Sequence, residues 1–132
     1  MQSELLAVLV VEDDALVQGM VDEALSEGGF GPQIVSSGEE AIALLQGDES
    51  NNWRALITDI NLSGSLTGWD VAKRARELLS DLPVIYMTGA AADQWPSHGV
   101  PNSVLLQKPF APAQVVTAVS QLLNGTPPVA PD

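Results

Sequence analysis

Short apolar stretches alternate with segments of helical periodicity along the chain. The first stretch, 5–11, is unbroken and rich in β-branched residues, which is typical of a strand buried on both faces. The next segment, 15–27, places apolar residues on one stripe of a helix, and Gly28 and Gly29 end it. Four more strand and helix pairs follow, and this alternation predicts β-α units around a parallel sheet.

The later strands and helices are predicted from the same patterns, which are short apolar runs for strands and a one-sided apolar stripe for helices. A capping box of Ser37 with Glu40 opens the second helix, and Pro112 occupies a favoured first helical position in the last. The segment 89–102 is the least regular and is expected to hold at most a short helix. The remaining strands are expected at 33–35, 55–60, 84–87 and 103–106, and the remaining helices at 37–46, 69–79 and 112–124.

The length of 132 residues fits one compact domain and is too short for two. We therefore expect a single α/β domain over residues 1–125, built as a doubly wound parallel sheet. Residues 126–132 contain three prolines and are expected to form a flexible Pro-rich tail.

Charge and composition exclude several functions. Seventeen Asp and Glu against five Lys and Arg give a formal net charge of −12, so binding to nucleic acid or anionic membranes is not expected. The absence of cysteine excludes disulfides, thiol catalysis and thiolate metal sites. No apolar run is long enough to span a membrane, and residues 1–4 lack the basic segment of a secretory signal, so we expect a cytoplasmic protein.

Polar residues with complementary chemistry stand at the predicted carboxyl ends of four strands. In a doubly wound sheet this edge is where ligands bind. Converging carboxylates repel one another unless a cation shares the site, and Mg²⁺ is a natural partner for oxygen ligands. A carboxylate beside Mg²⁺ can attack phosphorus, and a lysine and a hydroxyl can then contact the phosphate. These residues are Glu12, Asp13, Asp14, Asp59, Thr88 and Lys108.

Each of these residues also has an ordinary structural interpretation. Asp14 directly precedes a helix and is expected to be its N-cap rather than a ligand. Thr88 alone is a common strand residue, and Lys108 alone is a common solvated charge. Asp59 is harder to explain structurally, because Asp is disfavoured in strands. The functional prediction therefore depends on the joint placement of the residues at one edge of the sheet.

Four short motifs, in order and at fitting spacing, resemble those of bacterial response-regulator receiver domains. The resemblance covers nearly the whole chain, from about Leu5 to Leu123, and implies a flavodoxin-like (βα)5 fold with five parallel strands in the order 2-1-3-4-5. The motifs are Leu9–Asp14, Thr58–Leu62, Met87–Gly89 and Gln107–Phe110.

The resemblance implies a Mg²⁺ site. Asp13 and Asp59 would bind the ion directly, and Glu12 would act mainly through metal-bound water. The backbone carbonyl of Asn61 would complete the ligands that the protein supplies.

The resemblance also implies a phosphoryl-transfer reaction. Asp59 would accept the phosphoryl group from a histidine kinase or a histidine phosphotransfer protein, and Thr88 and Lys108 would contact the phosphate. Pro109 is expected to follow a cis peptide bond.

Two features depart from the common receiver pattern. Leu105 stands where receivers that control output domains usually carry Tyr or Phe; Tyr86, two residues before Thr88, is a candidate partial substitute. This pattern resembles a stand-alone receiver subclass that lacks the aromatic residue in strand five. The loop 62–68 is one residue longer than usual and rich in glycine.

The preferred hypothesis is a phosphorylation-controlled interaction module, not an enzyme with turnover on a separate substrate. It would act on an unknown downstream protein or relay phosphate, as a monomer or weak dimer, alone or as part of a larger protein. One alternative is a Mg²⁺-dependent aspartate-based phosphatase or phosphotransferase, although Asn61 stands where such enzymes usually carry a second Asp. Others are a degenerate receiver that binds constitutively and, ranked last, a flavodoxin-like binding module.

Overall fold

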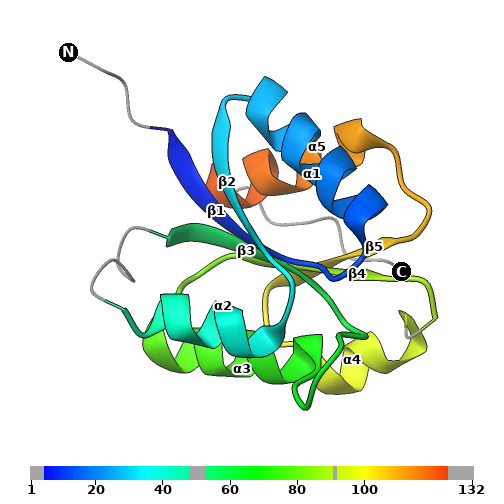
Figure 1. Ribbon diagram of the computed structural model, residues 1–132. Helices are drawn as coiled ribbons and strands as arrows, with labels where there is room; N and C mark the ends of the chain where they lie inside the picture. The colour runs from blue at the N-terminus through cyan, green and yellow to red at the C-terminus, as the bar shows by residue number, and fades with distance from the viewer. Residues whose placement is uncertain (1–4, 48–52, 91, 125–132) are drawn as a thin grey trace.

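The computed structural model describes residues 5–47, 53–90 and 92–124, so the predicted tail 126–132 lies outside the described residues. Five parallel strands form one sheet in the order β2-β1-β3-β4-β5 (Figure 1). The expected α/β fold and its strand order are confirmed. The strands are β1 (Leu6–Val11), β2 (Phe30–Val35), β3 (Trp53–Asp59), β4 (Val84–Thr88) and β5 (Ser103–Gln107).

Helices cover both faces of the sheet, as the alternation of elements predicts. Figure 1 shows α1 and α5 on one face and α2, α3 and α4 on the other. Among the described residues, none of these helices combines the length and apolarity needed to cross a bilayer. The helices are α1 (Ala15–Glu27), α2 (Gly38–Leu45), α3 (Gly68–Leu78), α4 (Trp95–His98) and α5 (Pro112–Leu123), with a short 3₁₀ turn, η2, at Ala92–Gln94.

Side-chain caps fix where α1 and α2 begin. The Asp14 carboxylate accepts hydrogen bonds from the backbone N–H groups of Leu16 and Val17, so its predicted role as the α1 N-cap is confirmed. Ser37 caps α2, but the Glu40 side chain accepts from the N–H of Ser36, so the predicted capping box is only half formed.

The start of β2 was predicted three residues too late. The strand begins at Phe30 and includes Pro32, which lacks a backbone donor and so argued against strand structure at that point. Because β2 is an edge strand of the sheet, a missing donor on its outer side leaves no strand hydrogen bond unmade. The segment 89–102 holds only η2 and the single-turn α4, as expected.

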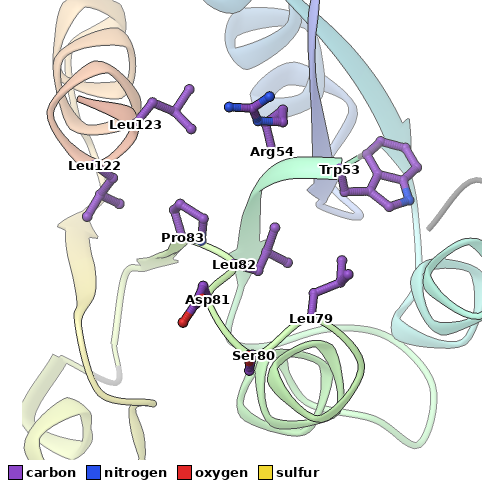
Figure 2. A pocket seen from close by; sticks show the side chains of 9 residues that line it. All are labelled: Trp53, Arg54, Leu79, Ser80, Asp81, Leu82, Pro83, Leu122 and Leu123. Carbon is purple, nitrogen blue, oxygen red and sulfur yellow. The ribbon is translucent and has the colours of Figure 1, made fainter. Parts of the chain in front are cut away.

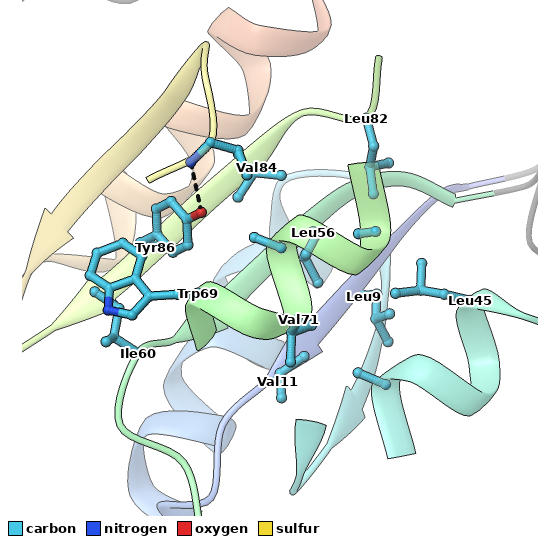
Figure 3. Packing of buried hydrophobic residues seen from close by; sticks show 14 of the residues in the cluster. Leu9, Val11, Leu45, Leu56, Ile60, Trp69, Val71, Leu82, Val84 and Tyr86 are labelled. Carbon is cyan, nitrogen blue, oxygen red and sulfur yellow. Dashed lines mark hydrogen bonds between the residues drawn. The ribbon is translucent and has the colours of Figure 1, made fainter. Parts of the chain in front are cut away.

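The sheet separates two hydrophobic clusters, one beneath α1 and α5 and one beneath α2 and α3. The second contains Tyr86, whose ring lies 4.8 Å from that of Trp69 at the start of α3. Figure 3 shows the Tyr86 hydroxyl at the end of a dashed line, which marks the 3.1 Å hydrogen bond that it accepts from the N–H of Val100. A fully buried tyrosine of β4 thereby holds the segment between α4 and β5.

A groove of about 420 Å³ lies at the amino-terminal ends of β3 and β4. Figure 2 shows Trp53 and Leu79 on one side of it and the α5 residues Leu122 and Leu123 on the other. The groove therefore lies at the amino-terminal edge of the sheet. The candidate site lies at the opposite edge, where the strands have their carboxyl ends.

Gly68 at the start of α3 packs directly against the end of β3. A Cβ atom at this position would overlap the carbonyl oxygen of Asp59 and the Cα of Ile60, and the Gly68 N–H donates to the Ile60 carbonyl at 2.8 Å. Both neighbours are backbone atoms, so they cannot rotate out of the way. Only glycine fits here, and it sets how α3 approaches Asp59.

We expect Gly68→Ala to lower the free energy of unfolding by roughly 1–3 kcal/mol, because overpacking forces the backbone to shift. Gly19→Ala is the control, since a Cβ at this exposed helical position meets nothing within 4 Å. That change should instead raise the free energy by roughly 0.5–1 kcal/mol. Urea unfolding followed by circular dichroism measures both, and equal effects of the two substitutions would contradict the close packing at Gly68.

Candidate functional site

Three carboxylates meet at the carboxyl edge of the sheet. Glu12 and Asp13 directly follow β1, and Asp59 is the last residue of β3. Glu12 is fully buried, Asp59 is 6% exposed and Asp13 is exposed. Each offers one oxygen atom, and these three oxygens lie within 4.8 Å of one another. The predicted convergence of the three side chains is therefore observed.

Lys108 places a positive charge between two of these carboxylates. Its Nζ donates to Oε1 of Glu12 at 3.0 Å and to Oδ2 of Asp59 at 3.2 Å. The backbone N–H of Lys108 donates to the carbonyl of Thr88 at 2.8 Å, which fixes the chain where it leaves β5. The peptide bond to Pro109 is cis, as the sequence resemblance implied.

Burial and the ion pairs shift the pKa values of Glu12 and Lys108. The pKa of Glu12 is raised, mainly by burial, although hydrogen bonds from the N–H of Asp14 and from Lys108 oppose the increase. Burial lowers the pKa of Lys108, but its bonds and charge interactions with Glu12 and Asp59 outweigh burial, and the net pKa is raised. Lys108 is therefore a firmly charged partner for both carboxylates at neutral pH.

Asp13 is held by a different partner. Its Oδ2 accepts hydrogen bonds from the backbone N–H of Ser63 at 3.0 Å and from the Ser63 hydroxyl at 2.7 Å. The bond from the Ser63 hydroxyl is the main reason that the pKa of Asp13 is lowered. Ser63 was not predicted as part of the site; the unusual length of loop 62–68 was the only signal in the sequence.

The other two predicted site residues lie beside the cluster. Thr88 is buried at the end of β4, next to Met87, which pairs with Asp59 in the sheet, and its hydroxyl oxygen accepts from the N–H of Ala90 at 3.1 Å. Asn61 is exposed in the turn that follows Asp59. Their roles as phosphate contact and carbonyl ligand stay predictions.

The donor set fits a hard divalent cation. Glu12, Asp13 and Asp59 offer carboxylate oxygens, which are the ligands that Mg²⁺ and Ca²⁺ take in proteins, and the described residues of the cluster contribute no sulfur or imidazole ligand. Mg²⁺ commonly binds one or two carboxylates and keeps several waters. The cluster, with Asp13 exposed and Glu12 and Asp59 buried, suits that habit.

The site thus consists of three carboxylates and a lysine at the carboxyl edge of a doubly wound parallel sheet. The model of the response regulator receiver domain matches residues 8–120, and the chain belongs to this family. The family suggested by the sequence motifs is thus confirmed.

Individual relatives agree with this assignment. A response regulator receiver protein from Sinorhizobium medicae has a TM-score of 0.88 at 40% identity, with 93% of this chain and 98% of that chain covered. The chemotaxis response regulator CheY4 of Vibrio cholerae has a TM-score of 0.76 at 22% identity over 90% and 99% of the two chains, which shows the fold alone. Response regulator MprA from Mycolicibacterium vanbaalenii is 28% identical over 92% of this chain and 52% of that relative, so this chain spans about half the length of the curated relatives it matches.

We expect Lys108→Met, measured without divalent cations, to lose stability relative to the wild type as the pH rises from about 5 to about 8. Loss of the ammonium raises the pKa of Glu12 further above its usual 4.5, so the folded state retains a proton that the unfolded state releases. Lys108 itself stays charged in both states over this range, because its usual pKa is 10.5 and folding raises it. At about pH 8 the deficit should be roughly 1–3 kcal/mol.

Lys73→Met is the matched control for this experiment, because it removes an exposed lysine from α3. Its unfolding free energy should follow the wild-type pH dependence. Parallel pH profiles for Lys108→Met and the wild type in urea unfolding would show that Lys108 does not control the ionisation of Glu12.

Proposed function

We propose that this chain is a Mg²⁺-dependent phosphorylation switch that accepts a phosphoryl group on Asp59 from a histidine kinase or a histidine phosphotransfer protein. The observation that carries the proposal is the Asp59 carboxylate, almost buried yet bonded to Lys108 and clustered with Glu12 and Asp13. A nucleophilic carboxylate with an adjacent cation is the arrangement that forms an acyl phosphate.

In the proposed reaction a carboxylate oxygen of Asp59 attacks the phosphorus of a phosphohistidine. The new P–O bond forms as the P–N bond breaks, and the bonding pair returns to the imidazole nitrogen of the donor. Lys108 offsets the charge that remains on the phosphoryl oxygens, and the hydroxyl of Thr88 contacts one of them. These roles need only small movements, because Lys108 already bonds Asp59 and Thr88 ends the adjacent strand.

Glu12, Asp13, Asp59 and the carbonyl of Asn61 are the residues that would hold Mg²⁺. The ion, when bound, supplies positive charge that neutralises the transferring group and orients its oxygens. Asp13 and Glu12 thus provide affinity, whereas Asp59 is both ligand and nucleophile.

An apolar groove beside Lys108 supports docking of the phosphodonor next to the site. The groove has a volume of about 390 Å³ and is lined by Val17, Met20, Pro109 and Phe110. Leu16, directly before Val17 in α1, is 86% exposed. Apolar side chains around a reacting charge offer a surface on which a donor helix can bury its own apolar face.

The output surface is proposed to be the segment 89–102 together with β5 and α5. A receiver in this role binds a downstream protein, or relays phosphate, and does not turn over a separate substrate. Tyr86 is oriented toward this segment, because its hydroxyl bonds the N–H of Val100, whereas Leu105 offers no aromatic ring on β5. Asn61, two residues past Asp59, provides no carboxyl group for acid-base catalysis and weighs against an aspartate-based phosphatase.

Incubation with acetyl phosphate and Mg²⁺ should add one phosphoryl group to the wild type, detected by intact-mass spectrometry. Asp59→Asn should show no such gain, because the amide is not a nucleophile of comparable strength. Omission of Mg²⁺ should reduce the gain by at least about tenfold, since the metal offsets charge in the transition state. A wild-type protein that stays unmodified with Mg²⁺ present would point to a degenerate receiver that binds constitutively.

Tyr86→Phe should leave phosphorylation of Asp59 intact and loosen the segment that precedes β5. Loss of one buried hydrogen bond costs about 1 kcal/mol, so the amide of Val100 should exchange its hydrogen several-fold faster in hydrogen–deuterium exchange. The amides of β1, which β3 separates from β4 in the sheet, serve as the internal reference. Unchanged exchange at Val100 would show that the Tyr86 hydroxyl does not hold the segment.

A further inference from the structure

The loop after Asp59 is fastened to two carboxylates by two serines. Ser63 donates its N–H and its hydroxyl to Oδ2 of Asp13, at 3.0 and 2.7 Å. Ser65 donates its N–H and its hydroxyl to Oε2 of Glu39, at 3.2 and 2.7 Å. Gly64 between them has φ +97°, a left-handed conformation that favours glycine and lets both serines face their acceptors.

The two clamps have different surroundings. Glu39 lies in the first turn of α2, away from the acidic cluster, so Ser65 serves only to anchor the loop. Asp13 is a member of the cluster, and its side chain is exposed, unlike the buried Glu12 and Asp59. Lys108 bonds Glu12 and Asp59, whereas Asp13 is held by Ser63.

An exposed carboxylate has free rotation about its side-chain bonds, and ordering it on metal binding costs conformational entropy. Two donors on the same oxygen of Asp13 remove most of that freedom before an ion arrives. Groups that bond a ligating carboxylate in this way control metal affinity without touching the ion.

We propose that Ser63 is a positioning residue of the metal site, which orients Asp13 for Mg²⁺ from the loop that follows Asp59. The inference rests on the Mg²⁺ binding in the proposed function and adds a residue that acts through Asp13. The chain supplies its own control, because Ser65 makes the same pair of bonds to a carboxylate outside the cluster.

Isothermal titration calorimetry with MgCl₂ alone, on the unphosphorylated full chain, tests the proposal. Ser63→Ala keeps the backbone bond but loses the hydroxyl bond, and its dissociation constant should rise by about tenfold. Ser65→Ala should stay within about twofold of the wild type, since its acceptor is not a ligand. Ser63→Thr restores a hydroxyl and should return the constant to within about threefold of the wild type.

The variants separate this inference from the proposed function. If the wild type and Ser63→Ala bind Mg²⁺ with equal affinity, the inference alone is overturned. Tighter binding by Ser63→Ala also overturns it, because Ser63 would then compete with the ion. An equal loss in Ser65→Ala also overturns it, because loop anchoring would then explain both. A wild type that binds no Mg²⁺ overturns the metal site and the role of Ser63 together. Far-ultraviolet circular dichroism confirms that each variant is folded.

Discussion

The shared ammonium of Lys108 is the interaction on which the rest of the site depends. Glu12 and Asp59 are two nearly buried carboxylates that share this ammonium, and burial is the main reason that the pKa of Glu12 is raised. A cation bonded to both offsets part of the cost of burying two negative charges side by side. The proposed nucleophile, Asp59, thereby has a cationic partner at a position that is only 6% exposed.

The sheet brings these charges together, and the close packing of its loops keeps them there. Parallel strands deliver their last residues to one edge, so side chains far apart in the chain become neighbours without any dedicated loop. Gly68 then holds the start of α3 against the backbone of Asp59, and the N–H of Lys108 holds the end of β5 against Thr88. The charged groups therefore stand at or next to the ends of strands, and Asp13 is in addition held by Ser63 of the loop that follows Asp59.

Much of this arrangement could be predicted from sequence because it follows from short-range rules. Apolar runs marked the strands, and Asp14 marked a helix start, while Glu12, Asp59 and Lys108 were expected to meet because each ends a parallel strand. The Ser63 contact could not be predicted, because it joins residues far apart in the chain and depends on the conformation of an irregular loop. The Tyr86 hydrogen bond was missed for the same reason. The first three residues of β2 were missed because a proline such as Pro32 is tolerated in a strand only at the edge of a sheet.

The single turn of α4 gives this molecule a weak point in its stability. A helix this short cannot persist by its own backbone bonds, because nucleation costs more than one turn returns. Hydrogen bonds to neighbouring residues keep α4 and the segment after it in place. The Tyr86 hydroxyl accepts from the N–H of Val100 and Trp95 donates to the Ser103 hydroxyl. The guanidinium of Arg76 donates to the carbonyl of Pro101. We therefore expect this segment to open locally at a lower free energy than the sheet beneath it, while β5 and α5, which follow it in the chain, stay part of the core.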